Sequence, residues 1–182
     1  MDNYRSKYPN LFKEAYWPWG PIRARFKLGD HEPRRDKIAN VNIVPYIGEK
    51  WVLLRLEDSS CEIPGGTIEP NETYLDTLRR ELMEEVGARL ISFHIIGAWH
   101  CQSLGDKPYR PHLPFPEFYR LVGMGEIREE QSPLNPPDGE KVVTVQYMTI
   151  AEAVNGFVKS GRPDLAEVYE LAAYFKADRG LV

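Results

Sequence analysis

The order of elements along the chain predicts an α/β fold in which helices cover a mixed β-sheet. Segments of β character come first, one amphipathic helix follows, further β-rich segments come next, and helices complete the order. Such an order is typical of a sheet covered by helices. The chain has 182 residues, of which 42% are hydrophobic and 27% charged. That composition is typical of a folded globular domain and excludes an intrinsically disordered chain.

Residues 1–38 are predicted to form an N-terminal extension rich in aromatic residues, and residues 39–182 the main domain. Prolines and glycine around Gly20 interrupt any long helix. The extension should therefore hold a short helix or turn, followed by a strand from Ile22 to Leu28. Its rings would pack on the flank of the domain, or they would form a dimer surface or part of a substrate pocket. The flank is the simpler interpretation.

A β-hairpin is predicted next. Residues 40–47 and residues 51–56 are β-rich and are separated by a short turn that contains Gly48. This is the pattern of two antiparallel strands. Gly65 and Gly66 follow the hairpin, and paired glycines allow a backbone to turn sharply and to approach a ligand closely.

The stretch after these glycines predicts an amphipathic helix. Leucine or valine recurs at offsets of three, four and four residues, which gives one apolar stripe formed by Leu75, Leu78, Leu82 and Val86. Thr73 is the expected N-cap, and Asp76 completes a capping box in place of the usual glutamate. Gly87 is the expected end of the helix.

Three glutamates should share one face of this helix. At about 100° per residue, Glu81 and Glu85 lie almost above one another, and Glu84 lies roughly 60–100° further round. Arg80 precedes Glu84 by four residues and is expected beside the three carboxylates, not among them. Clustered oxygen ligands suit Mg²⁺ or Mn²⁺. From the residues alone, a metal site and an ordinary charged helix face remain equally open.

The second half of the chain alternates strands with proline-rich loops and then turns to helices. Further strands are expected over residues 89–101, 118–122 and 142–148. The loops 103–117 and 131–141 lie between them, and loops of this length often carry specificity. Thr149 is the expected cap of a helix that starts at Ile150, and a last helix should cover residues 163–176.

Charge and cysteine content restrict the partners and the location. With a formal net charge of −4, the chain lacks the basic excess of a general nucleic-acid binder, so nucleic acid is not expected as a partner. No apolar run approaches roughly 18 residues, so no membrane span is expected, and the N-terminus has no apolar signal-peptide core. Cys61 and Cys101 form neither a disulfide framework nor a metal spacing, which favours a reducing cytoplasm.

The segment around the amphipathic helix resembles the signature box of the Nudix hydrolase family. The matching positions are Gly66, Glu72, Arg80, Glu81, Leu82, Glu84, Glu85 and Gly87. All of them stand at the spacing of the signature. Ala88 is the one departure, since a larger aliphatic residue is usual there. The resemblance implies a Nudix-type α/β/α sandwich with a mixed sheet and a central catalytic helix.

The resemblance also implies an activity. Members of this family hydrolyse nucleoside diphosphates linked to another group, by attack of water on phosphorus and with a divalent metal ion. We therefore expect a hydrolase acting on phosphorus anhydride bonds, with Mg²⁺ as cofactor and Mn²⁺ as the alternative. The metal ligands implied by position are the carbonyl of Gly65 and the carboxylates of Glu81, Glu84 and Glu85. Arg80 and Glu72 would hold these groups in place.

The sequence offers several candidates for the general base and for the substrate contacts. The base would be a glutamate of the box, Glu81 or Glu84, or else Glu140 in the second loop. Glu117 is a third candidate. The expected substrate-binding residues, in or next to the first loop, are Tyr109, Arg110, Phe115 and Glu117.

Features outside the box do not identify the substrate. The segment from Leu113 to Pro116 faintly resembles part of the motif of reduced-dinucleotide pyrophosphatases, but its flanking residues differ. Tyr109 lies in the region where the dinucleoside-polyphosphate group carries a tyrosine. Two other classes stay open. One is a catalytically silent Nudix domain that senses a nucleotide, and the other is an isopentenyl-diphosphate-isomerase-like enzyme, which would need a cysteine opposite a glutamate.

Overall fold

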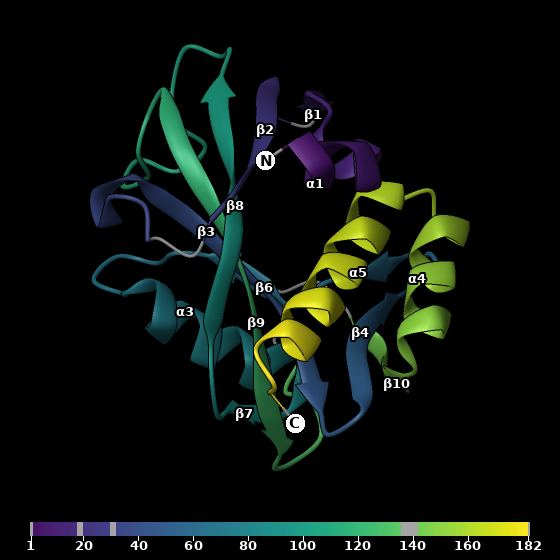
Figure 1. The fold of residues 1–182 in the computed structure, drawn as a ribbon. Helices are drawn as coiled ribbons and strands as arrows, with labels where there is room; N and C mark the ends of the chain where they lie inside the picture. The colour runs from purple at the N-terminus through teal and green to yellow at the C-terminus, as the bar shows by residue number, and fades with distance from the viewer. Residues whose placement is uncertain (1, 18–19, 30–31, 136–141, 182) are drawn as a thin grey trace.

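The computed structural model describes residues 2–17, 20–29, 32–135 and 142–181, and a ten-stranded sheet forms its centre (Figure 1). Along the main path the strands are β1 (Ala15–Trp17), β2 (Ile22–Leu28), β8 (His94–Ser103), β9 (Glu117–Glu129), β3 (Ile38–Ile47), β4 (Lys50–Leu56) and β10 (Val142–Met148). Three short strands pair with β4, β3 and β9: β5 (Cys61–Glu62), β6 (Gly65–Thr67) and β7 (Ala88–Leu90). Because β3 and β9 run parallel while the other described pairs are antiparallel, the sheet is mixed, as predicted.

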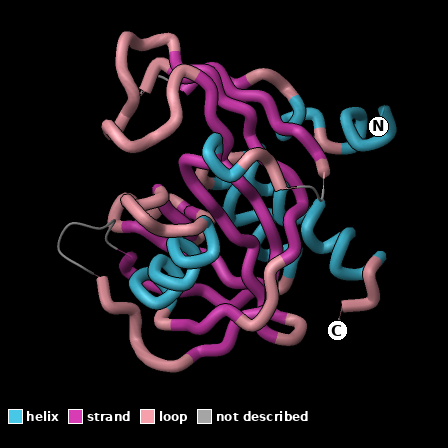
Figure 2. Tube along the Cα trace, turned by 90° about the vertical axis from the view of Figure 1, so that its left-hand side faces the viewer, coloured by secondary structure: helices cyan, strands magenta, loops and turns pink. Residues whose placement is uncertain are grey.

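Helices cover both faces of this sheet, which confirms the predicted α/β/α sandwich (Figures 1 and 2). On one face lie α3 (Tyr74–Glu81) and the π-helical turn η2 (Leu82–Val86). On the other lie α1 (Asp2–Lys7), α2 (Pro9–Phe12), α4 (Ile150–Lys159) and α5 (Pro163–Asp178). A 3-10 turn, η1 (Arg35–Lys37), leads into β3. In Figure 1, α3 lies to the lower left of the sheet, and α4 and α5 lie to its right.

Alternation along β3 separates two hydrophobic cores. Val41 and Ile43 are fully buried and belong to the core beneath α3, where they meet Leu78 and Leu82. Val44 points the other way, into the core beneath α4 and α5. Successive side chains of a strand alternate between its faces, so one strand supplies both cores. Full burial of each such side chain stabilises the fold by about 1.5–3 kcal/mol.

The box helix begins as its sequence predicts. The Thr73 hydroxyl accepts a hydrogen bond from the Asp76 N–H at 3.2 Å, and the Asp76 carboxylate accepts one from the Thr73 N–H at 3.0 Å. This reciprocal capping box satisfies two backbone donors that a helix start would otherwise leave unpaired. The same device starts α4, where Thr149 and Glu152 cap each other.

The last turn of the box helix differs from the prediction of a regular α-helix. Residues 82–86 form a π turn, in which the N–H of Gly87 bonds to the carbonyl of Leu82. A π turn holds more residues than an α turn. The positions around the helix axis that were expected for Glu84 and Glu85 assumed a regular α-helix, so they do not hold in this turn. Gly87 ends the helix as predicted, in a left-handed conformation with φ of 71°.

The N-terminal extension takes part in the same sheet and the same core. β2, which confirms the strand predicted there, pairs with β8 along its whole length. Glu167 of α5 accepts hydrogen bonds from the Leu11 N–H and from Asn10 Nδ2, both at 2.7 Å. Tyr8 and Phe26 are buried against α5 and β8. Tyr8 and Phe26 thus pack on the flank of the domain, as the simpler interpretation expects, whereas Trp17 lines a cleft.

Two strand predictions need correction. The strand predicted over residues 89–101 is two strands, β7 and β8, because the chain leaves the ladder where the N–H groups of Ile91 and Ser92 both donate to the Glu126 carbonyl. The strand predicted over residues 118–122 is longer, since β9 continues to Glu129. The hairpin, β10, α4 and α5 are confirmed. None of the helices in the described ranges combines the length and hydropathy that crossing a membrane requires.

Candidate active site

A cleft of about 1330 Å³ lies where the box meets the N-terminal extension. The glycines of β6 and the glutamates of the box helix line one end of it. Trp17 of β1 and Ile22 of β2, which lie at the other end of the strand order from β6, also line it, as does Leu165 of α5. The first proline-rich loop also borders the cleft. Residues far apart in the sequence therefore face one shared space.

The paired glycines are required by close contacts. Gly65 has φ of 144°, and a Cβ there would stand 2.2 Å from the carbonyl oxygen of Val41. At Gly66 a Cβ would stand 1.8 Å from Oε1 of Glu81. Any side chain would thus displace either the backbone of β3 or the Glu81 carboxylate. The N–H of Gly65 donates to Oε2 of Glu85 at 3.0 Å, which ties the turn to the helix.

Arg80 lies among the carboxylates, which corrects the prediction that it lies beside them. Its guanidinium holds Glu72 through two bonds, Nε to Oε1 at 2.8 Å and Nη2 to Oε2 at 3.1 Å. Its Nη1 donates to Glu81 at 2.8 Å and to Glu84 at 3.3 Å. Nη2 also donates to the carbonyl of Thr67 at 3.3 Å. A planar guanidinium can make all these bonds at once, because its donors point in fixed directions.

This network shifts the pKa values of two glutamates in opposite directions. Arg80 and the Thr77 hydroxyl, together with the Glu69 N–H, lower the pKa of Glu72 from 4.5 to about 2. Burial raises the pKa of Glu81 although Arg80 acts to lower it. The two carboxylates therefore differ in their surroundings: Glu72 accepts from several donors, whereas Glu81 is half-buried, accepts from Arg80 and lies near Glu84 and Glu72.

The box offers donors that fit a hard divalent cation. Its carboxylate oxygens are the ligand type that Mg²⁺ prefers, and Glu81 and Glu84 already converge on one cationic nitrogen, Nη1 of Arg80. Within the described ranges, no three His, Cys, Asp or Glu side chains stand close enough to hold a metal ion as they are placed. The ligand type of the box therefore fits a divalent cation. In this structure the same carboxylates bond to Arg80 and to the N–H of Gly65.

Three of the predicted substrate contacts line the cleft. They are Tyr109, Arg110 and Phe115. Tyr109 is 73% exposed, and its ring lies 5.9 Å from the guanidinium of Arg110. Arg110 in turn forms an ion pair with Glu69 of the box loop. The first proline-rich loop is thereby joined to the box.

Glu117, a fourth predicted contact, is not brought to the cleft. Glu117 begins β9, its side chain is 57% exposed, and its carboxylate lies 4.0 Å from Nε2 of His100. It is not among the residues that line the cleft. Glu140 lies outside the described residues.

Several cleft residues were missed by the sequence analysis. They include Asn40 and Asn42 on β3, Trp99 on β8 and Arg120 on β9. The two asparagines could have been singled out from the sequence, because they are polar residues spaced two apart in a strand that is otherwise apolar and central. Trp99 and Arg120 gave no such signal, since a single aromatic or cationic residue is ordinary in a strand.

Neither cysteine reaches the cleft. Cys61 and Cys101 are both free and buried. Burial raises the pKa of the Cys101 thiol to about 12, which keeps it protonated and poorly reactive. An isomerase of the isopentenyl diphosphate type would need a cysteine facing a glutamate across the site. The described part of the cleft provides no such pair.

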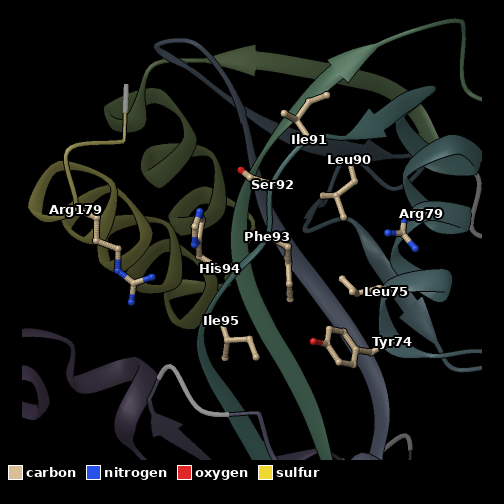
Figure 3. A pocket seen from close by; sticks show the side chains of 10 residues that line it. All are labelled: Tyr74, Leu75, Arg79, Leu90, Ile91, Ser92, Phe93, His94, Ile95 and Arg179. Atoms are coloured by element: carbon tan, nitrogen blue, oxygen red, sulfur yellow. The ribbon is translucent and has the colours of Figure 1, made fainter.

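A second cavity, of about 540 Å³, lies on the other side of α3 (Figure 3). Its walls come from Tyr74 and Leu75 of the box helix and from the segment 90–95. Arg79 and Arg179 stand at its two sides in Figure 3. Because none of its lining residues is acidic, it lacks the carboxylates that distinguish the cleft.

Sequence comparison relates the chain to known proteins. The profile of the NUDIX domain family matches residues 37–172. A Bacillus subtilis protein provisionally named an 8-oxo-dGTP diphosphatase is 31% identical over 106 residues, covering 58% of this chain and 66% of that protein. An RNA pyrophosphohydrolase of Ruthia magnifica subsp. Calyptogena magnifica is 35% identical over 98 residues, covering 53% of this chain and 46% of that protein. The match thus spans less than two thirds of each relative.

Solved structures show the same fold at lower identity. A Bacillus subtilis pyrophosphohydrolase superposes with a TM-score of 0.54 at 23% identity, covering 75% of this chain and 77% of that chain. A NUDIX hydrolase from Nitrosomonas europaea gives a TM-score of 0.53 at 18% identity, covering 76% and 89%. The family profile spans most of the chain, and the box is intact in sequence and folded as a loop and helix. The chain therefore belongs to the Nudix family.

Proposed function

We propose that the chain is a divalent-metal-dependent pyrophosphohydrolase that cleaves a nucleoside diphosphate linked to another group. The observation that carries this proposal is the intact box, with its glutamates gathered at one end of a large cleft. Two relatives named for diphosphatase and pyrophosphohydrolase activities support the same class of reaction. Both free cysteines are buried, which supports a reducing cytoplasm as the site of the reaction.

The proposed roles follow from the contacts of the box. Glu81, Glu84 and Glu85 would hold Mg²⁺ or Mn²⁺, together with the carbonyl of Gly65. A divalent cation bound there supplies neutralisation of charge on the pyrophosphate oxygens, which phosphoryl transfer chiefly requires. Arg80 and Glu72 keep the carboxylates in place, and the glycine turn lets the backbone come close to the phosphates.

Two glutamates are candidates for the base that accepts the proton of the attacking water. Glu84 belongs to the box, and its side chain is 25% exposed, so it borders the solvent of the cleft. Glu140 belongs to the second loop. If Glu140 is the base, Glu140→Gln lowers turnover with little change in substrate binding. If Glu84 is the base, Glu140→Gln leaves turnover unchanged.

The proposal is tested by a panel of nucleoside diphosphate derivatives with Mg²⁺, assayed for phosphate and nucleotide release. The double variant Glu84→Gln and Glu85→Gln keeps side-chain shape but removes two charges, so turnover should fall by orders of magnitude while the fold survives. Glu170→Gln, on the exposed face of α5, is the matched control and should keep full turnover. Near-normal turnover of the double variant at saturating Mg²⁺ would exclude these glutamates as ligands.

A further inference from the structure

A row of directly opposed residues leads from the box toward the N-terminal extension. Thr67 on β6, whose carbonyl accepts from Arg80, lies opposite Asn40 on β3. Asn40 lies opposite Arg120 on β9, and Arg120 lies opposite Trp99 on β8. Opposed residues of neighbouring strands project from the same face of a sheet. All four residues of the row line the cleft, and at about 4.8 Å between strands the row measures roughly 14 Å.

Trp17 covers the far end of this row. Its ring meets Trp99 edge to face, with centroids 6.1 Å apart and an interplanar angle of 66°. The guanidinium of Arg120 lies 5.2 Å from the centroid of Trp17. Trp17 precedes the segment that matches the family profile, which starts at residue 37. Trp17 therefore adds to the cleft a wall residue from outside the matched segment.

The two asparagines of β3 are the buried polar residues at this row, whereas Thr67 and Arg120 are half-buried. Arg120 Nε donates to Oδ1 of Asn40 at 3.2 Å, and Asn40 is 9% exposed. Asn42, two residues along the same face of β3, is 6% exposed and lines the cleft. Within the described residues its side-chain amide makes no hydrogen bond. Because no side-chain nitrogen or oxygen atom of the described residues is both fully buried and unpaired, this amide is open to the cleft and available to a polar group of a ligand bound there.

The chemistry changes along the row in a defined order. Carboxylates stand at the box end, amides of asparagine follow, and a guanidinium flanked by two indole rings stands at the far end. Flat aromatic rings with an adjacent arginine stack bases, and arginine and asparagine donate to base edges. A nucleoside 5′-phosphate with its phosphate at the box would extend along the row, with its sugar near Asn42 and its base near Arg120.

We propose that Trp17, Trp99 and Arg120 form a nucleobase subsite, in which the N-terminal extension supplies the outer wall. This inference rests on the pyrophosphohydrolase function proposed above, and it names the part of the substrate that the box cannot distinguish. The base lies against Trp17, its edge meets Arg120, and the Asn42 amide bonds to the sugar. Base recognition thus depends on a residue outside the family domain.

Two ligands that differ only by the base test this subsite. Isothermal titration of the whole chain with guanosine 5′-monophosphate and with ribose 5-phosphate, at fixed Mg²⁺, measures what the base contributes. We expect the nucleotide to bind roughly 5- to 150-fold more tightly, the range that stacking of a base on an aromatic ring gives. Trp17→Leu should remove most of that ratio and leave the affinity for ribose 5-phosphate unchanged. Trp17→Phe, which keeps an aromatic ring, should retain most of it.

Tyr16→Ala is the matched control, because Tyr16 neighbours Trp17 on β1 but is 61% exposed and does not line the cleft. It should leave both affinities unchanged. Equal affinity of the wild type for the two ligands, or no binding of either, overturns the proposal. So does a Trp17→Leu variant that folds normally and keeps the wild-type ratio. Base-dependent binding without turnover on any substrate would instead reject the proposed hydrolysis and support the subsite.

Discussion

Arg80 contacts more groups of the box than any one carboxylate does, and this makes it the residue most sensitive to change. Its three nitrogens reach Glu72, Glu81 and Glu84, as well as the carbonyl of Thr67. Glu72 is the anchor of this network, because it also accepts from Thr77 Oγ1 at 2.6 Å. The carboxylates that would hold the metal are therefore fixed through a residue that would not contact it.

Arg80→Lys should weaken metal affinity and turnover together, each by about 10- to 100-fold. Lysine keeps the positive charge but cannot hold Glu72 with two parallel bonds while it also reaches Glu81. Titration of Mg²⁺ against turnover separates the two effects. Arg79→Lys is the control, since Arg79 is exposed and pairs only with Asp76 among the salt bridges of the described chain. Unchanged metal affinity with a raised KM would mean that Arg80 grips the substrate instead.

Glu72 should make the stability of the fold depend on acid pH. Its pKa falls from 4.5 to about 2 on folding, so the unfolded chain binds more protons than the folded chain between these values. The stabilisation from its carboxylate is fully present above about pH 4.5 and is lost as the pH falls through about 2. Glu72→Gln should lower the urea midpoint near neutral pH and flatten its decline in this acid window. An unaltered acid decline in the variant would contradict this assignment.

At the scale of elements, the sequence predicted the helix caps and turns, because these features depend on contacts between residues that are close in sequence. The capping boxes at Thr73 and Thr149, the glycine turn and the stop at Gly87 each depend on a few neighbouring residues, and each was predictable. The π turn over residues 82–86 was not, because the helical spacing of Leu82 and Val86 is compatible with either kind of turn. It arises where the helix end must also place Glu85 against Gly65.

The same contrast applies to the cleft. The box could be predicted from one contiguous stretch, including the glutamates and Arg80. The row from Asn40 through Arg120 to Trp99 could not, because it depends on which strands are neighbours and in which register. The parallel pairing of β3 with β9 joins residues about 80 positions apart. Sequence periodicity indicates a strand but not its partner.

The first proline-rich loop should influence substrate ranking without changing metal binding. Tyr109 and Phe115 line the cleft from this loop and do not belong to the box that would hold the metal. Tyr109→Ala or Phe115→Ala should therefore change the order of kcat/KM across a substrate panel and leave the Mg²⁺ titration as in the wild type. Leu104→Ala, on the same loop but with an exposed side chain that does not line the cleft, should change neither. A fixed order in both variants would place specificity outside this loop.

At the scale of the whole molecule, the two ends of the chain meet on one face of the sheet. α2 packs against α5 and β2, and Glu167 holds the start of the chain through the Leu11 N–H and Asn10. The core there includes residues from both ends and from the central strands. The outer wall of the cleft is consequently supported by the C-terminal helix, although the two are far apart in sequence.

Leu11→Ala should therefore destabilise the entire fold and not only the extension. Leu11 is 1% exposed in the core shared by α2 and α5, so its truncation removes buried methyl groups and leaves a cavity, at a cost of about 2–5 kcal/mol. Because β2 is hydrogen-bonded to β8 along its length, loss of the extension exposes the central sheet, and unfolding should remain one transition. Calorimetry should give a single peak at lower Tm, whereas Lys13→Ala, an exposed neighbour, should leave Tm unchanged. Two separate peaks, with only the earlier one moved by Leu11→Ala, would show that the extension folds as an independent unit and that the wall formed by Trp17 can detach from the cleft.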